Sequence, residues 1–204
     1  MRWFLAALLL ITAEGAWAQK SPAPVLPFRT VCISGGMSWP VTHEGLTRYW
    51  RGGPTVAVDF NVRFRRRFLL GVGLDVAAFW FRSSRFIQSN PGVPLHNMPV
   101  SHITIALTGR VELTPGKRFV PYLGLSIGAS RLTAAVYREV IDSVRVTWFN
   151  IPGRTRLSAG GIAGVSFQTS RWLGVEAESR LLYVHNDPDA GLVVLLRAGL
   201  RFTI

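Results

Sequence analysis

The residues of this 204-residue chain that could act in catalysis are first of all its histidines and serines. A nucleophilic hydrolase needs a serine within hydrogen-bond reach of a histidine base. His185 lies in the run 183–188, which contains no serine, and the nearest candidates by strand position are Ser179 and Ser101. We therefore interpret His185 as a solvated loop residue.

Acid–base and metal chemistry find no better support in the sequence. His102 shares a strand face with Arg110 and Glu112, but eight to ten residues of strand span about 27–34 Å, so they cannot touch within that strand. Asp187 and Asp189 are too few for a calcium site. The sequence shows no catalytic triad, zinc spacing or phosphate-binding glycine motif. We predict no cofactor, no metal site and no enzymatic activity.

Ten other charged positions share a different property, because they alternate with apolar residues inside predicted strands. They are the acids Asp59, Asp75, Glu112, Glu176 and Glu178 and the bases Arg63, Arg110, Arg180, Arg197 and Arg201. Buried charges are costly unless they are paired. The balance of five acids and five arginines predicts an internal ion-pair network that plugs a narrow barrel. The alternative is a polar channel lining, which large and steady single-channel conductance would reveal.

Strands with period-two hydrophobicity must position these charges. In the run 56–64, valine and phenylalanine take the even positions, whereas Ala57, Asp59, Asn61 and Arg63 take the odd ones. One face of such a strand is apolar and the other is polar. Eight segments follow this rule, at about 28–39, 56–64, 68–81, 100–113, 119–132, 157–168, 173–184 and 192–204.

The connections between these segments alternate strictly between short and long. The short ones are 65–67, 114–118 and 169–172, and the long ones are about 40–54, 82–99, 133–156 and 185–191. Outer-membrane barrels have short periplasmic turns and longer extracellular loops, whereas a soluble sandwich has no reason to sort its loops by length. Within the third long loop, residues 133–147 could form a hairpin around 141–143.

Aromatic residues gather where the predicted strands meet their connections. The short-turn end carries Phe64, Phe68, Phe119, Phe167, Trp172 and Phe202, and the long-loop end carries Trp39, Trp80, Phe81 and Tyr183. Two such girdles flank the lipid-facing band of a membrane barrel. The alternative is that strand ends in any β protein collect aromatics.

The N-terminus has the form of a secretory signal peptide. One charge, Arg2, precedes an apolar run over 3–13, and small residues at Ala16 and Ala18 favour cleavage after residue 18. We predict a signal peptide at 1–18, a periplasmic segment at 19–27 and a barrel at 28–204. The single cysteine, Cys32, rules out an intramolecular disulfide. No later segment reaches 18 consecutive apolar residues, which argues against membrane-spanning helices.

Lipid surroundings force the predicted strands to close. An unpaired backbone N–H or C=O costs several kcal/mol in hydrocarbon, so the first and last strands must pair. An even number of strands returns both termini to the periplasmic side. The predicted fold class is all-β, an eight-stranded antiparallel transmembrane up-and-down β-barrel after a cleaved signal peptide.

The net charge of +12 lies outside the barrel wall, because the interior charges balance. Basic residues at the short-turn end are Arg65, Arg66, Arg67, Lys117, Arg118 and Arg171. Those in or beside long loops are Arg48, Arg51, Arg82, Arg85, Arg138, Arg145, Arg154 and Arg156. Such side chains attract anionic headgroups, which predicts outer-membrane lipid, including lipopolysaccharide, as a partner. Nucleic acid is the generic alternative for a basic chain, but export and the lack of a nucleic-acid motif argue against it.

Several stretches make the chain resemble the small outer-membrane β-barrel family, related to the membrane domain of OmpA-like proteins. They are 121–128, 160–165, 174–178 and 197–202. The resemblance covers nearly the whole mature chain and implies a cell envelope protein of Gram-negative bacteria. In that family a terminal aromatic residue helps the barrel-insertion machinery to recognise the chain. Here Ile204 is last, and Phe202 lies two positions earlier on the same face.

The predicted function is a structural or surface-interaction role in the outer membrane. The long loops 40–54, 82–99 and 133–156 are the expected contacts for a surface ligand, because loops on rigid barrels often carry binding function. A narrow porin for small solutes is the alternative. A lipid A-modifying enzyme is a third class, without a visible site.

Overall fold

The computed structural model describes residues 29–42, 44–89, 91–92, 100–133, 135–141, 144–151, 153–185 and 191–204. The predicted signal peptide and periplasmic segment lie outside these residues. Among the residues that the structure describes, no helix has both the length and the apolar character needed to cross a membrane.

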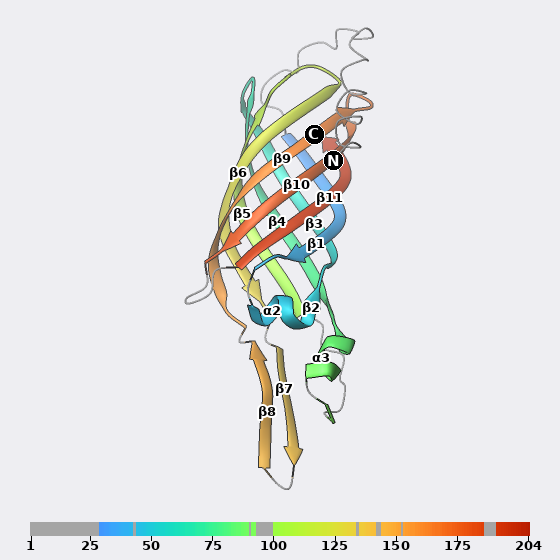
Figure 1. Ribbon diagram of the computed structural model, residues 1–204. Helices are drawn as coiled ribbons and strands as arrows, with labels where there is room; N and C mark the ends of the chain where they lie inside the picture. Colours follow the sequence, from blue (N-terminus) through green and yellow to red (C-terminus); the bar gives the residue numbers. More distant parts are fainter. Residues whose placement is uncertain are drawn as a thin grey trace.

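Eight long antiparallel strands close into a barrel, which confirms the predicted fold class (Figure 1). They are β1 (Arg29–Pro40), β3 (Gly53–Arg65), β4 (Phe68–Phe81), β5 (Val100–Glu112), β6 (Phe119–Leu132), β9 (Thr155–Gln168), β10 (Leu173–Val184) and β11 (Gly191–Thr203). Seven pairings join sequential members of this set, and the eighth joins β11 to β1, with Thr30 opposite Thr203 and Pro40 opposite Val193. No edge of this barrel is left unpaired, as hydrocarbon surroundings require.

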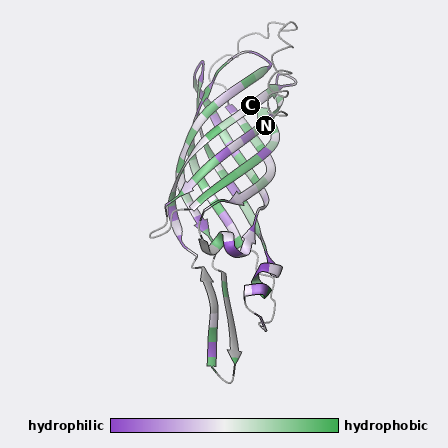
Figure 2. Cartoon of the chain, viewed as in Figure 1, coloured by the Kyte–Doolittle hydropathy of each residue, from purple (hydrophilic) through white to green (hydrophobic). Residues whose placement is uncertain are grey.

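Alternation assigns each wall residue to lipid or to the lumen. Along β3 the side chains of Val56, Val58 and Phe60 are exposed, whereas Ala57 and Asp59 are buried. Figure 2 shows the resulting mixture of apolar and polar bands along the tilted strands. The core of this protein is therefore its lumen, and its apolar surface faces outward.

Five short elements lie at the end of the barrel opposite the two termini (Figure 1). They are α2 (Glu44–Tyr49), β2 (Trp50–Arg51), α3 (Ser83–Ser89), β7 (Ala135–Ile141) and β8 (Val144–Ile151). The strands β7 and β8 pair with each other in a separate two-stranded sheet, which confirms the predicted hairpin. Short turns mark the other end; following the usual arrangement of outer-membrane barrels, we name that end periplasmic and the end with these elements extracellular.

Glycine lets neighbouring strands approach closely at one position in particular. A Cβ on Gly128 of β6 would lie 2.1 Å from the carbonyl oxygen of Ile105 on β5. Real Cβ atoms do not tolerate such a distance from backbone, so a larger residue would force the two strands apart. At Gly161 of β9 a Cβ would meet no atom within 4 Å.

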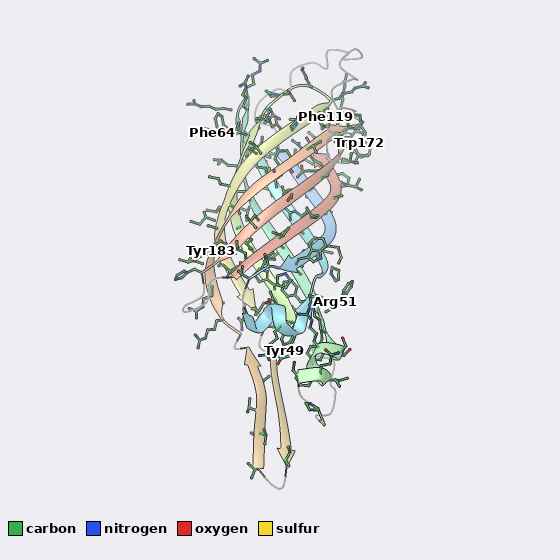
Figure 3. All side chains as sticks on the ribbon, viewed as in Figure 1. Tyr49, Arg51, Phe64, Phe119, Trp172 and Tyr183 are labelled. Atoms are coloured by element: carbon green, nitrogen blue, oxygen red, sulfur yellow. The ribbon has the colours of Figure 1, made fainter. Side chains whose placement is uncertain are left out.

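Exposed aromatic side chains lie near both ends of the barrel wall. Phe64, Phe119 and Trp172 lie at the end that holds the termini, and Tyr183 lies nearer the other end (Figure 3). Other girdle candidates with exposed rings are Trp39, Phe68, Trp80 and Phe167, and Phe202 is half-buried. Phe81 departs from its expected place in the girdle. It follows the lipid-facing Trp80 and so turns inward, with its ring 5.5 Å from those of Trp50 and Phe86.

Candidate functional site: the barrel lumen and its extracellular cap

The strands direct all ten charged side chains of the proposed network into the lumen. Each of them is at most 7% exposed. They come from β3, β4, β5, β10 and β11, so their contacts tie together parts of the wall that are distant in sequence. From the periplasmic end outward, the lumen holds an ionic layer, a larger ionic cluster, a mainly polar layer and an apolar cap.

The periplasmic layer centres on Glu112 of β5. Its carboxylate lies 2.7 Å from Nη2 of Arg63 and 3.5 Å from Nη2 of Arg201. Arg63 also donates to the carbonyl oxygen of Arg66 in the first short turn, and Arg201 donates to the hydroxyl of Ser166. This layer joins β3, β5, β9 and β11 at the periplasmic mouth.

Arg197 of β11 lies at the centre of the larger cluster. Its Nη2 lies 2.8 Å from Asp59 and 2.6 Å from Glu178, and its Nη1 contacts Asp75. One guanidinium therefore meets three carboxylates from three strands. Arginine suits this role because its planar donors are fixed in a fork and its charge is permanent.

Two further arginines complete the cluster. Arg180 lies 2.8 Å from Asp75 and 3.1 Å from Glu178. Arg110 lies 2.8 Å from Glu176 and 3.0 Å from Glu178. The carboxylate of Glu178 therefore meets the guanidiniums of Arg110, Arg180 and Arg197 at once.

Tyr122 adds a neutral donor to the same cluster. Its hydroxyl lies 2.8 Å from Glu176 and 3.0 Å from Glu178, and the guanidinium carbon of Arg110 lies 5.1 Å from its ring centroid. The residue is 3% exposed, so its single hydroxyl proton is shared between the two carboxylates away from water. Hydrogen bonds to buried carboxylates are among the stronger ones in proteins.

Above the ionic cluster the lumen is lined mainly by uncharged polar side chains, and the half-buried Arg156 of β9 lies opposite Ser130 at this level. The hydroxyls of Thr104 and Ser130 lie 2.8 Å apart and are buried. His102 is buried as well, and its ring stacks on Phe79 at a centroid distance of 6.3 Å. This layer leads from ion pairs to the apolar cap.

The extracellular mouth is filled by apolar side chains from both the wall and the first long loop. The wall contributes Phe79, Val100, Leu182, Val193 and Leu195, and the loop contributes Leu46 from α2 and Trp50 from β2. Trp50 is fully buried, and β2 is held by pairing with the end of β4. The first long loop thus folds back over the lumen, and only part of it faces outward.

The lumen retains little space between these layers. A cavity of about 10 Å³ lies between the periplasmic layer and the central cluster, lined by residues that include Thr30, Asn61 and Tyr122. That is roughly the space of one water molecule. The described side chains therefore leave room for about one water molecule at this point of the lumen.

Arginines remain on the outside of the extracellular cap. Arg48, Arg51 and Arg85 are exposed, and Arg82 is half-buried. The guanidinium of Arg51 lies 5.4 Å from the ring centroid of Trp80, and Figure 3 shows Arg51 beside α2. The backbone N–H of Arg82 donates to the carbonyl oxygen of Tyr49, which joins the two arginine-bearing loops.

Solved structures with the same architecture are bacterial outer-membrane proteins. The structure resembles Neisserial surface protein A, with a TM-score of 0.55 and 14% identity, covering 86% of this chain and 96% of that one. It also resembles a major outer membrane protein from Thermus thermophilus, with a TM-score of 0.55 and 10% identity, covering 87% and 99%. The outer membrane protein OprG from Pseudomonas aeruginosa gives a TM-score of 0.50 and 9% identity, covering 89% and 98%. No family model and no curated protein matches the sequence.

The chain has the fold of the small outer-membrane β-barrels. Its localisation in the outer membrane follows from the fold together with the lipid-facing wall, on which Leu70, Leu107 and Leu125 are more than half exposed. Identities this low establish the architecture of the barrel and leave its role to its own residues.

The catalytic candidates of this outer-membrane barrel do not converge on one site. Ser179 is exposed on the lipid side of β10, and His185 is exposed just beyond that strand. Ser101 is half-buried, and its backbone N–H donates to the hydroxyl oxygen of Thr133 at 2.9 Å. Asp187 and Asp189 lie outside the described residues.

Two parts of the lumen were missed by sequence reasoning. Tyr122 could have been found, because Leu123 and Leu125 face lipid and the residue before them must therefore point inward. The apolar cap also left a signal, since the run 192–196 is apolar on both faces of its strand. Two-sided apolar character at one end of a barrel strand indicates that the lumen is dry there.

Proposed function

We propose that this outer-membrane barrel is a closed scaffold that engages an anionic component of the cell surface through its long loops. The observation that carries the proposal is the series of two ionic layers, a polar layer and an apolar cap inside the lumen, which supports a closed barrel. A barrel of eight strands has an interior just wide enough for side chains to fill. If the lumen is closed to solutes, binding must take place on the outer surface of the protein.

The charge of the first two long loops supports an anionic partner. Residues 40–54 and 82–99 contain Arg48, Arg51, Arg82 and Arg85 and a single acid, Glu44, which gives a net charge of 4 − 1 = +3. The apolar side of α2 is occupied by the cap, so the arginines remain available. Arg51 lies over Trp80, which is exposed at headgroup level, so the cluster lies beside the outer leaflet.

Lipopolysaccharide is the anionic component that fits this position, because its phosphates lie at the same depth as the extracellular girdle. Guanidinium groups bind phosphates through paired hydrogen bonds, and each basic group near an anionic surface adds about 1 kcal/mol. The hairpin of β7 and β8 extends further from the membrane and offers a second contact surface to the exterior.

The proposal is tested by binding of purified lipopolysaccharide to the full barrel in bilayer nanodiscs. The triple variant R48Q/R51Q/R85Q should bind lipopolysaccharide at least about tenfold more weakly than the wild type, since three such contacts are removed. The matched control is R65Q/R66Q/R67Q, which removes three arginines at the opposite end and should bind normally. Equal binding by the wild type and R48Q/R51Q/R85Q would count against the proposal.

Enzymatic modification of lipid A is a separate possible function, and it needs its own test. The described serines and histidines do not form a nucleophile–base pair, and the proposal assigns no reaction to them. Mass spectrometry of lipid A from cells with and without the protein should give identical species. A new deacylated or acylated species would replace the proposal with an enzymatic role.

A further inference from the structure

The three periplasmic turns of the barrel carry a concentration of positive charge that neither the lumen nor the loops explain. Six residues, which we call the basic collar, occupy these turns: Arg65, Arg66, Arg67, Lys117, Arg118 and Arg171. All six are exposed. The turns at 65–67, 113–118 and 169–172 contain no acidic residue.

The collar has no counter-charge in the part of the chain that the structure describes. The ion pairs found there all lie in the lumen, and the nearest acid, Glu112, faces inward and is engaged by Arg63 and Arg201. Exposed like charges that are this close repel one another. An external anion would relieve that repulsion.

Each turn of the collar also places an exposed aromatic ring directly beside a basic residue. Phe64 precedes Arg65, Phe68 follows Arg67, and the guanidinium of Arg65 lies 5.8 Å from the ring centroid of Phe64.

The same pairing recurs at the other two turns. Phe119 follows Arg118, and Trp172 follows Arg171. Figure 3 shows Phe64, Phe119 and Trp172 at the end of the barrel that holds the termini. Rings of this kind settle at the headgroup level, so the basic groups beside them lie at the depth of lipid phosphates.

We propose that the basic collar binds anionic phospholipid headgroups of the inner leaflet of the outer membrane. Guanidinium groups suit phosphodiesters because they donate two parallel hydrogen bonds. The collar residues lie around the barrel at the membrane surface and not on a projecting domain. This position favours the surrounding lipid headgroups as the ligand over a soluble polymer of the periplasm. Such binding would fix the depth of the barrel from below, independently of any contact made by the extracellular loops.

Neighbouring turns of the collar are joined, since the backbone N–H of Glu112 donates to the carbonyl oxygen of Arg67 at 2.8 Å, but only two of the three turns flank Trp172. The backbone N–H of Gln168 donates to the carbonyl oxygen of Arg118 at 2.8 Å, which holds the turns at 113–118 and 169–172 side by side. Lys117, Arg118 and Arg171 therefore lie on the two turns nearest to Trp172. The turn at 65–67 lies on the opposite side of the barrel from Trp172 in the strand order. Four strand spacings separate them, about 19 Å around the wall, which exceeds the Debye length at physiological salt.

The experiment uses the fluorescence of Trp172 in the full barrel, with Trp39, Trp80 and Trp148 replaced by Phe. Trp50 stays in place as a lipid-shielded background, because it is fully buried. The barrel is placed in phosphatidylcholine bilayers that contain a minority of brominated phosphatidylglycerol or of brominated phosphatidylcholine. Bromine quenches a nearby tryptophan, so the ratio of quenching by the two lipids reports a local preference for the anionic headgroup.

Phosphatidylglycerol should quench Trp172 more strongly than phosphatidylcholine at equal mole fraction. The variant K117Q/R118Q/R171Q should lose that preference, with roughly a fivefold loss of relative lipid affinity for each charge removed. The control R65Q/R66Q/R67Q removes equal charge beyond screening distance and should keep it. Heat-dependent gel mobility should show that all variants are folded.

Two results would overturn the proposal. One is equal quenching of Trp172 by the two lipids in the wild-type collar. The other is an unchanged preference in K117Q/R118Q/R171Q. Retention of the protein by purified peptidoglycan, lost in that variant without any lipid preference, would assign the collar to the cell wall instead. None of these outcomes depends on lipopolysaccharide binding at the opposite end.

Discussion

Replacing Arg197 with methionine gives the sharpest test of the ionic cluster. The cluster contains four carboxylates, those of Asp59, Asp75, Glu176 and Glu178, and three guanidiniums. Its net charge is therefore 3 − 4 = −1, and R197M makes it −2 while keeping an unbranched stem in place of the arginine methylenes. Removing one partner from a buried ion pair costs about 3–5 kcal/mol, because the remaining charge stays buried.

We expect R197M to lower the free energy of unfolding by about 3–5 kcal/mol in urea titrations of the barrel in lipid bilayers. The double variant R197M/D75N restores the net charge of −1, and Asp75 forms ion pairs only with Arg180 and Arg197 among the described residues. The double variant should therefore recover about 0.5–3 kcal/mol relative to R197M. The exposed control R154M should stay within about 0.5 kcal/mol of the wild type.

Unfolding of R197M at the same urea concentration as the wild type would contradict a stabilising role for this ion-pair cluster. A further loss of stability when D75N is added to R197M would show that charge balance is not the source of the loss.

Three further predictions address the cap, the wall and the hydroxyl of the cluster. W50A should lower the free energy of unfolding by about 3–5 kcal/mol, because it empties the centre of the cap, and a loss below about 1 kcal/mol would contradict that packing. G128A should reduce the folded fraction measured by heat-dependent gel mobility, because its Cβ would lie 2.1 Å from a backbone oxygen. The control G161A should fold like the wild type, because a Cβ there meets no atom within 4 Å. Equal folding of the two variants would refute the close approach of β5 and β6 at Gly128. Y122F should cost about 1.5–3 kcal/mol in the same urea titration, since Glu176 and Glu178 lose the one hydroxyl proton that they share, and a neutral effect would show that water replaces it.

Most of the wall could be read from the sequence because two physical constraints act on every residue of it. Lipid outside and a narrow lumen inside force alternation, so the expected segment 119–132 and the strand β6 have the same bounds. The least regular segment, 157–168, was placed correctly as well, although β9 begins slightly earlier, at Thr155. Glycines there weaken the hydrophobic signal but serve close strand contacts.

The inward direction of the ten charges also followed from alternation, but their pairing did not. Period two places Arg197 in the lumen, yet it says nothing of depth along the barrel axis. That depth depends on the stagger between strands, which sets Arg197 opposite Glu178 and brings it to Asp59 and Asp75. Stagger is a property of the closed barrel and is not encoded in any one strand.

The cap lay beyond sequence reasoning for a similar reason. Leu46 and Trp50 belong to a long loop, and nothing in their local sequence shows that the loop folds back over the lumen. Only the matching apolar residues on the inner wall, such as Phe79 and Leu195, reveal a surface for them to cover. The loop and the inner wall had to be compared with each other before the sequence could indicate the cap.

The most direct test of the closed barrel is single-channel recording of the wild-type protein in planar bilayers. The proposed closed lumen predicts no steady unitary conductance above the bare bilayer, at either polarity. Large and steady single-channel conductance in the wild type would contradict the account and favour a narrow porin.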